Sequence, residues 1–200
     1  MYAATAPATR SLRFEEEDME KKLTLPLSWE DIDDLHAGDS VLLTGYTYTG
    51  RDQAHKRLVA CMDEDRPLPV DIRNAAIYYV GPAPASPGHA VGPAGPTTSY
   101  RMDAFAPRLM DSGLKVMIGK GQRNQAVKDA IIRNHCVYFA AIGGAAALLS
   151  SHIVNSEVLA YDDLGPEAIH RFELKDFPVT VAFDCHGGDL YKEGPEKYRK

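Results

Sequence analysis

Several residues and motifs are scarce in this chain, and each scarcity excludes a class of protein. Only three of the 200 residues are cysteines, and none has the Cys-x-x-Cys spacing, which argues against a disulfide framework or a self-contained metal site. No apolar run approaches the roughly 18 residues of a membrane-spanning helix. The Gly-x-x-x-x-Gly-Lys-Ser/Thr motif is also absent, so the chain is not a P-loop nucleotide-binding protein.

Positive charge is in deficit as well. The chain has 22 Lys and Arg against 28 Asp and Glu, which gives a net charge of −6. This balance argues against general affinity for nucleic acid or for an anionic membrane surface. Any local concentration of cations in such an acidic chain therefore needs an explanation.

The length and composition indicate one soluble globular domain with a sizeable core. We expect residues 1–22 to form an N-terminal extension, because residues 15–22 are almost entirely charged, and residues 23–200 to form the domain. No apolar segment of the signal-peptide kind follows Met1, so we expect a cytoplasmic protein. Cys61 and Cys136 fall in apolar patterns and are expected to be buried thiols.

The hydrophobic patterns alternate between strand and helix periods, which predicts a mixed α/β fold. From residue 192 onwards the tail is charged, and we expect its end to be mobile. Helices are expected over 28–35, from Asp52 to the Pro67 region, from Asp103 to Gly113, from Asn124 onwards and within 143–149. We expect Asp52 and Asn124 to be the N-caps of the second and fourth of these helices. Strands are expected over 23–27, 41–48, 75–80, 115–118, 137–141, 156–161, 168–174 and 179–184.

A glycine-proline loop precedes the third of these helices and carries the first candidate site. Thr97 and Thr98 follow the loop directly, and Arg101 comes four residues after Thr97. We expect Asp103 to cap the helix, so that free N–H groups, the helix dipole and Arg101 favour a bound anion. The alternative is an ordinary tight turn with a surface arginine.

Two further cations stand where a predicted strand passes into a helix. Arg51 follows the strand over 41–48, and Lys120 lies between two glycines after the strand over 115–118. Ligands of open α/β sheets bind at such carboxyl ends of strands. If Arg51, Arg101 and Lys120 converge, they form a site for a small compound with more than one carboxylate, with Thr97 or Thr98 able to exchange a proton. The alternative for Arg51 is a solvated basic helix face.

Four segments in this order resemble one known family. They read Thr-Gly-Arg-Asp-Gln-Ala-His-Lys-Arg (49–57), Gly-Pro-Thr-Thr-Ser-Tyr-Arg-Met-Asp (95–103), Ile-Gly-Lys-Gly-Gln-Arg (118–123) and Ile-Gly-Gly-Ala-Ala-Ala-Leu (142–148). Over about residues 23–195 the chain is similar to the C-terminal domain of class I, iron–sulfur fumarate hydratases, which also occurs as a separate β subunit in two-subunit fumarases and L-tartrate dehydratase.

The resemblance implies a swivelling β/β/α domain with a mixed sheet and flanking helices. It implies reversible hydration of fumarate to L-malate together with an α subunit, in an α2β2 assembly, that carries the [4Fe–4S] cluster on its own cysteines. Arg51, Arg101 and Lys120 match substrate-carboxylate ligands, and Thr97 matches the proposed catalytic base. This chain is then expected to bind no metal itself, and His55 is a second candidate for the proton carrier.

Two other functions remain open from the sequence. The chain resembles the β subunit of L-tartrate dehydratase as well, although the segment 122–125 after Lys120 is more similar to fumarases. A non-catalytic module that binds dicarboxylates or serves assembly would use the same cations without turnover.

Overall fold

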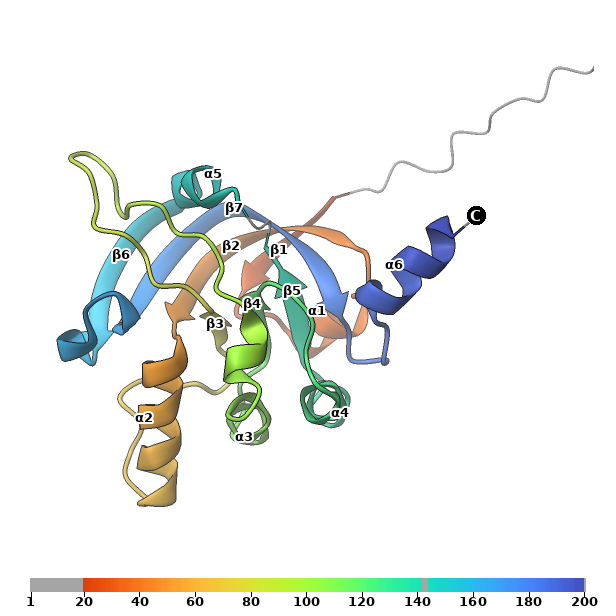
Figure 1. Ribbon diagram of the computed structural model, residues 1–200, viewed down its shortest axis with the longest axis horizontal. Coiled ribbons are helices and arrows are strands. Elements are labelled where there is room, and N and C mark those ends of the chain that lie inside the picture. The colour runs from red at the N-terminus through yellow and green to blue at the C-terminus, as the bar shows by residue number, and fades with distance from the viewer. Residues whose placement is uncertain (1–19, 142–143, 200) are drawn as a thin grey trace, which may run out of the picture.

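The centre of the computed structural model, which describes residues 20–141 and 144–199, is a seven-stranded mixed sheet (Figure 1). The strand order is β1-β2-β3-β4-β5-β7-β6, and β2 also pairs with β7. The strands β2, β3, β4, β5 and β7 therefore close into a barrel, with β1 and β6 added at its sides. Their bounds are β1 Lys21–Leu25, β2 Ser40–Thr49, β3 Ala76–Tyr78, β4 Val116–Gly119, β5 Val137–Ala140, β6 Ile153–Ala160 and β7 Ile169–Phe183.

The predicted mixed α/β class with a sheet and flanking helices is confirmed, while closure of the sheet was not predicted. The strands β2, β3, β4 and β5 run parallel to one another, and β7 is antiparallel to both β5 and β2. The boundary expected between residues 22 and 23 stays a prediction, because residues 1–19 lie outside the described ranges.

The prediction of two strands over 168–174 and 179–184 was wrong, because β7 is a single strand of 15 residues. The interruption expected at residues 176–178 is an irregularity within the strand. Asp176 adopts a left-handed backbone with φ 47, and its N–H donates to Thr44 Oγ1 at 3.1 Å. Because pairing with β2 continues on both sides of Asp176, the strand bends there instead of ending.

The helices α2, α3 and α4 lie side by side against one face of the barrel (Figure 1). Most of the charged tail from residue 192 belongs to α6, whose N-cap Asp189 accepts from the N–H groups of Tyr191 and Lys192, and the mobility expected at its end stays a prediction. The bounds of the helices are α1 Trp29–Asp33, α2 Asp52–Asp63, α3 Ala106–Asp111, α4 Gln125–Arg133, α5 Ala146–Ser151 and α6 Leu190–Tyr198, with 3₁₀ turns η1 Ser99–Met102 and η2 Asp162–Glu167.

The helix ends test the predicted caps. Asn124 caps α4 as predicted, through its side chain and the N–H of Val127. Asp103 does not cap α3, whose N-cap is Phe105, and Asp52 is the first helical residue of α2 rather than its cap. The helix N-terminus expected at Asp103 therefore lies further along the chain, at Phe105 and Ala106, and the anion site expected beside Asp103 stays a prediction that rests on side chains such as Arg101.

The core consists of two layers that follow from strand alternation. Tyr78, Ile118 and Phe139 point into the barrel, whereas their neighbours Ile77 and Met117 pack toward the helices. The three cysteines are free and buried, as expected for Cys61 and Cys136. Among the described helices, none has the length and apolarity needed to cross a membrane.

A buried ion pair joins the segment around η1 to the start of α4. Arg123 Nε donates to Asp103 Oδ1 at 2.6 Å, and the N–H of Asn124 donates to Asp103 Oδ2 at 2.7 Å. The Arg123 side chain is 0% exposed, and its guanidinium also lies 5.3 Å and 5.0 Å from the ring centres of Tyr79 and Tyr138. The carboxylate that was expected to cap α3 is therefore used as a tertiary contact.

Replacing one partner of this pair should destabilise the fold strongly. Arg123→Met leaves the Asp103 charge buried without its counterion, and we expect a loss of about 3–5 kcal/mol in the free energy of unfolding, measured with urea. Arg133→Met is the matched control, because its pair with Asp111 is about half exposed and should contribute about 1 kcal/mol or less. Equal losses in the two variants would contradict this account.

Candidate functional site

The candidate site lies at the carboxyl edge of three adjacent parallel strands. Arg51 follows β2, and Lys120 follows β4 directly. Between them, the N–H of Thr97 donates to Tyr79 O at 2.7 Å, just past the end of β3, so the long loop over 81–96 returns to the strand that it leaves. Thr98 then pairs with Lys120 in an isolated parallel bridge. Three of the four predicted site residues thus follow neighbouring strand ends.

Two of the predicted cations meet at a shared carboxylate. Arg101 Nε donates to Asp52 Oδ1 at 2.8 Å, and Arg51 Nη2 lies 3.9 Å from Asp52 Oδ2. Arg51 Nη2 is also 3.6 Å from Glu167 Oε1 in η2. The Arg51 side chain is 24% exposed and that of Arg101 is 44% exposed, so both guanidinium groups remain accessible from solvent. The structure therefore brings Arg51 and Arg101 together.

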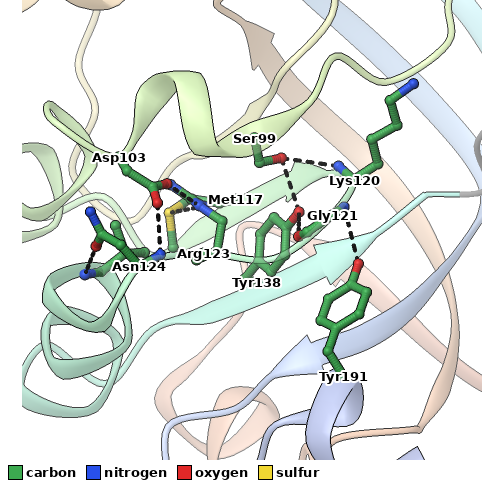
Figure 2. Close-up of polar contacts among 10 residues, drawn as sticks. Ser99, Asp103, Met117, Lys120, Gly121, Arg123, Asn124, Tyr138 and Tyr191 are labelled. Carbon is green, nitrogen blue, oxygen red and sulfur yellow. Dashed lines mark hydrogen bonds and ion pairs between the residues drawn. The ribbon is translucent and has the colours of Figure 1, made fainter. Parts of the chain in front are cut away.

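Lys120 lies at the same edge, but no ion pair with a residue of the described ranges engages its ammonium group. Figure 2 shows its side chain pointing away from Asp103 and Arg123. The backbone is fixed by Ser99, whose Oγ accepts from the Lys120 N–H at 3.0 Å and whose N–H donates to Lys120 O at 2.9 Å. Lys120 is thus tied through its backbone to the segment that carries Arg101, while its side chain makes no hydrogen bond or ion pair with the described residues of the arginine pair.

Two tyrosines from distant elements hold the turn after Lys120 (Figure 2). Tyr138 Oη lies 2.9 Å from Ser99 Oγ and 3.0 Å from Gly121 O, and Tyr191 Oη accepts from the Gly121 N–H at 3.0 Å. Gly119 is required for this arrangement, since a Cβ there would come within 2.0 Å of Ser99 Oγ. The turn is therefore rigidly placed, and only the Lys120 side chain is free to adjust.

Thr97 and Thr98 are both half-buried at the rim of this edge. The Thr97 hydroxyl makes no hydrogen bond to the residues that the structure describes, so it is available to a ligand. The helix dipole expected to act on this hydroxyl is missing, because η1 is a single short turn and α3 begins only at Ala106. Positive charge near Thr97 must therefore come from side chains.

Two acidic residues of the site were not identified as such from the sequence. Asp52 was taken for a helix cap, although its position directly after Arg51 signals a possible partner. Glu167 accepts from the N–H of Gln53 at 2.9 Å as well as facing Arg51. It lies more than 100 residues beyond Arg51 and has no local motif, so only the packing of η2 on α2 reveals it.

His55, the second candidate proton carrier, lies beneath this edge. Its side chain is completely buried, and Nδ1 is 2.9 Å from Arg51 O. Burial is the main cause that lowers its pKa to about 4, assisted by the positive charge of Arg123 and opposed by the Arg51 carbonyl. His55 is therefore neutral at physiological pH and supports the turn that positions Arg51.

Comparison with known proteins gives this arrangement a context. The family model described as Fumarase C-terminus matches residues 3–194. The chain is 40% identical over 153 residues to the aerobic class I fumarate hydratase of Escherichia coli K12, which covers 76% of this chain and 28% of that protein. It is 36% identical over 158 residues to fumarate hydratase 2 of Leishmania major, and this match covers 78% of this chain and 28% of that protein.

A second kind of relative matches along its whole length. The β subunit of L(+)-tartrate dehydratase from Escherichia coli K12 is 31% identical over 185 residues, which are 90% of each chain. By contrast, the chain spans little more than a quarter of the fumarate hydratases that it matches. The match over nearly all of its residues shows that the chain belongs to the fumarase C-terminal domain family.

Proposed function

We propose that the chain is the β subunit of a two-subunit iron–sulfur hydro-lyase that interconverts fumarate and L-malate. The observation that carries the proposal is the pair of guanidinium groups of Arg51 and Arg101, at the same sheet edge as Thr97 and Lys120. Arg101 uses Nε for Asp52, which leaves its terminal N–H groups for a substrate carboxylate. Lys120 then binds the other carboxylate as a point charge.

Thr97 is the proposed base, which takes the proton from the carbon next to one carboxylate in the dehydration direction and returns it during hydration. A threonine hydroxyl is a very weak acid, so its alkoxide needs strong stabilisation. The positive charges of Arg51, Arg101 and Lys120 favour the ionised form through their field. Substrate positioning and proton transfer are therefore the tasks assigned to this chain.

The cysteines of this chain do not form a ligand set for a [4Fe–4S] cluster. The Cys61 thiol lies 3.7 Å from Tyr161 Oη, that of Cys136 donates to Leu114 O, and that of Cys185 contacts Ile32 O. Each contact belongs to a different part of the core. We therefore assign the cluster to a partner α subunit, in an α2β2 assembly, against which this domain is expected to swivel. The cytoplasmic location also stays a prediction.

The main alternative is the β subunit of an L-tartrate dehydratase. It is favoured by the match over 90% of the length of the Escherichia coli subunit. Malate and tartrate are both dicarboxylates, so the cations at this edge suit either substrate. Turnover of malate and of tartrate by the complex of this chain with its α subunit distinguishes the two, and we expect malate.

Thr97→Ala should lower turnover of the two-subunit enzyme by orders of magnitude while malate still binds, because only the proton-transfer step loses its base. Thr98→Ala is the matched control, since it removes the neighbouring hydroxyl and should retain most of the activity. Steady-state kinetics on malate, with binding followed separately, measure both effects. Near-normal turnover in Thr97→Ala would show that another group is the base.

Arg101→Met should weaken malate binding by roughly 1.5–3 kcal/mol, the contribution of one hydrogen bond to a charged group. Arg108→Met, which removes an exposed arginine paired with Asp63, should leave the affinity unchanged. Calorimetric titration of the assembled enzyme measures the difference. If the Arg101 variant binds as tightly as the control, Arg101 does not contact the substrate. If neither the complex nor the free chain turns over malate or tartrate, the chain is a non-catalytic module.

The buried neutral state of His55 predicts a specific pH dependence of stability. The unfolded chain takes up the imidazole proton near pH 6.5, whereas the folded chain does so only near pH 4. Stability is therefore lost as the pH falls through this interval, by about 2 kcal/mol between pH 7 and pH 5. The free energy of unfolding, measured with urea at pH 7 and at pH 5, should fall by about 2 kcal/mol less in His55→Gln than in the unmodified chain. The exposed His89→Gln should show the same fall as the unmodified chain. If the free energy of unfolding of His55→Gln falls as much between pH 7 and pH 5 as that of the unmodified chain, His55 is already charged in the folded protein.

A further inference from the structure

A cluster of potential metal ligands lies far from the candidate site. Asp33 ends α1, His135 follows α4, and Cys185 comes two residues after β7. Each residue offers one donor atom, and the three atoms lie within 4.8 Å of one another. They are a carboxylate oxygen, an imidazole nitrogen and the thiol sulfur. His135 lies two residues before the start of β5, whereas Arg51 and Lys120 follow the carboxyl ends of β2 and β4. The cluster therefore belongs to the opposite edge of the barrel.

The types of donor atom indicate which ion would fit. Thiolate, imidazole and carboxylate are the protein ligands of Zn²⁺, with bond lengths of about 2.0–2.3 Å. Tetrahedral ligands at these lengths are separated by about 3–4 Å. Asp33 Oδ1 and His135 Nε2 already lie 3.7 Å apart, so only a small approach of the donor atoms is needed. The sulfur ligand favours zinc-like ions over Mg²⁺ or Ca²⁺.

The three segments are held together by contacts that do not need a metal. The His135 ring stacks on Trp29, with ring centres 3.5 Å apart and planes within 4°. His186 Nε2 donates to Asp33 O at 2.8 Å, which fixes the end of α1 against the turn after β7. The orientation of the imidazole and the position of the backbone at Asp33 are thus set in advance, and the Asp33 side chain, which is 53% exposed, is the one that must become ordered on binding.

The residue that follows the C-cap of α4 is unusual for its position. His135 adopts a left-handed backbone with φ 51, and its N–H donates to Ile132 O at 3.2 Å. Glycine is the residue usually found there, since it takes this conformation without strain. Glycine at position 135 would satisfy the backbone equally well, so the imidazole has to be explained by its side-chain contacts.

We propose that Asp33, His135 and Cys185 bind one divalent transition-metal ion of the zinc type at the surface of this chain. Water completes the tetrahedron as the fourth ligand. His135 gives up its present hydrogen bond from Nε2 to Trp29 O, which is 3.2 Å long, and coordinates through that nitrogen. The Cys185 thiol loses its proton to solvent on binding. The ion links α1, the turn before β5 and the turn after β7, and this site does not depend on the proposed catalytic function.

Co²⁺ is a suitable probe, because it occupies zinc sites and absorbs in the visible and near-ultraviolet. The full-length chain, kept reduced and free of metal, should bind one equivalent of Co²⁺ with a thiolate charge-transfer absorption, and Zn²⁺ should displace it. Cys185→Ser should abolish this absorption. Asp33→Asn and His135→Gly should each weaken binding by more than the roughly tenfold that is typical of losing an outer-sphere partner.

The controls use neighbouring or similar residues outside the cluster. Asp34→Asn changes the adjacent exposed carboxylate and His89→Ala an exposed imidazole on the loop over 81–96, so neither should alter the affinity. Circular dichroism checks the fold of each variant, and His135→Gly is expected to fold because glycine suits the backbone at that position. Binding without the charge-transfer absorption, or an absorption that persists in Cys185→Ser, would overturn the proposal.

Discussion

The placement of the candidate site residues depends on the pairing of one long strand with two other strands of the barrel. Residues 169–183 form β7, which pairs antiparallel with β2 along most of its length and with β5 near its end. This double pairing closes the barrel and removes two sheet edges at once. Because β2, β3, β4 and β5 remain parallel inside the closed sheet, their carboxyl ends meet on one side, and the loops that follow them converge.

Convergence of these loops does not by itself fix the residues that they carry. The turn at Lys120 is held in place by hydrogen bonds from other segments. Ser99 clamps the backbone of Lys120 from the η1 side, and a hydroxyl from β5 and another from α6 hold the next turn. Each of these contacts is between segments far apart in the chain. The cations can therefore be placed with little freedom of the backbone, and their residual motion lies in the side chains.

The sequence contains local information on this fold but little on its long-range contacts. The capping side chain of Asn124 and the glycine turn at Gly113 could be predicted, because both depend on a few adjacent residues. Asp103 could not be assigned correctly, since an aspartate before an apolar helix reads as a cap whether its carboxylate faces its own helix or, as here, Arg123 on another segment. The continuity of β7 could not be predicted either, because the residues over 176–178 are typical of a turn, and only the pairing with β2 on both sides shows that the strand continues.

For the candidate site residues, too, the sequence predicts local positions but not long-range contacts. That Arg51 and Lys120 lie at strand ends could be predicted from the alternation of strand and helix patterns, whereas the position of Thr97 beside the end of β3 is seen only in the structure. The structure also brings Arg51 and Arg101 together through Asp52. Their roles came from a resemblance of motifs and stay predictions. Glu167 had no signal in the sequence, because its relation to Arg51 arises only where η2 packs on α2.

The charges at this edge do not balance a dicarboxylate. Arg51 and Arg101 are paired with the two carboxylates of Asp52 and Glu167, and Lys120 lies at the same edge without an ion pair, which leaves a net charge of +1 among the described residues of the site. A bound dianion would therefore carry one uncompensated negative charge at a partly exposed surface. Binding then requires either that a carboxylate moves away from its arginine or that a second polypeptide contributes positive charge. Supplying that charge is a task for the proposed α subunit, since this chain covers only 28% of the length of the fumarate hydratases that it matches.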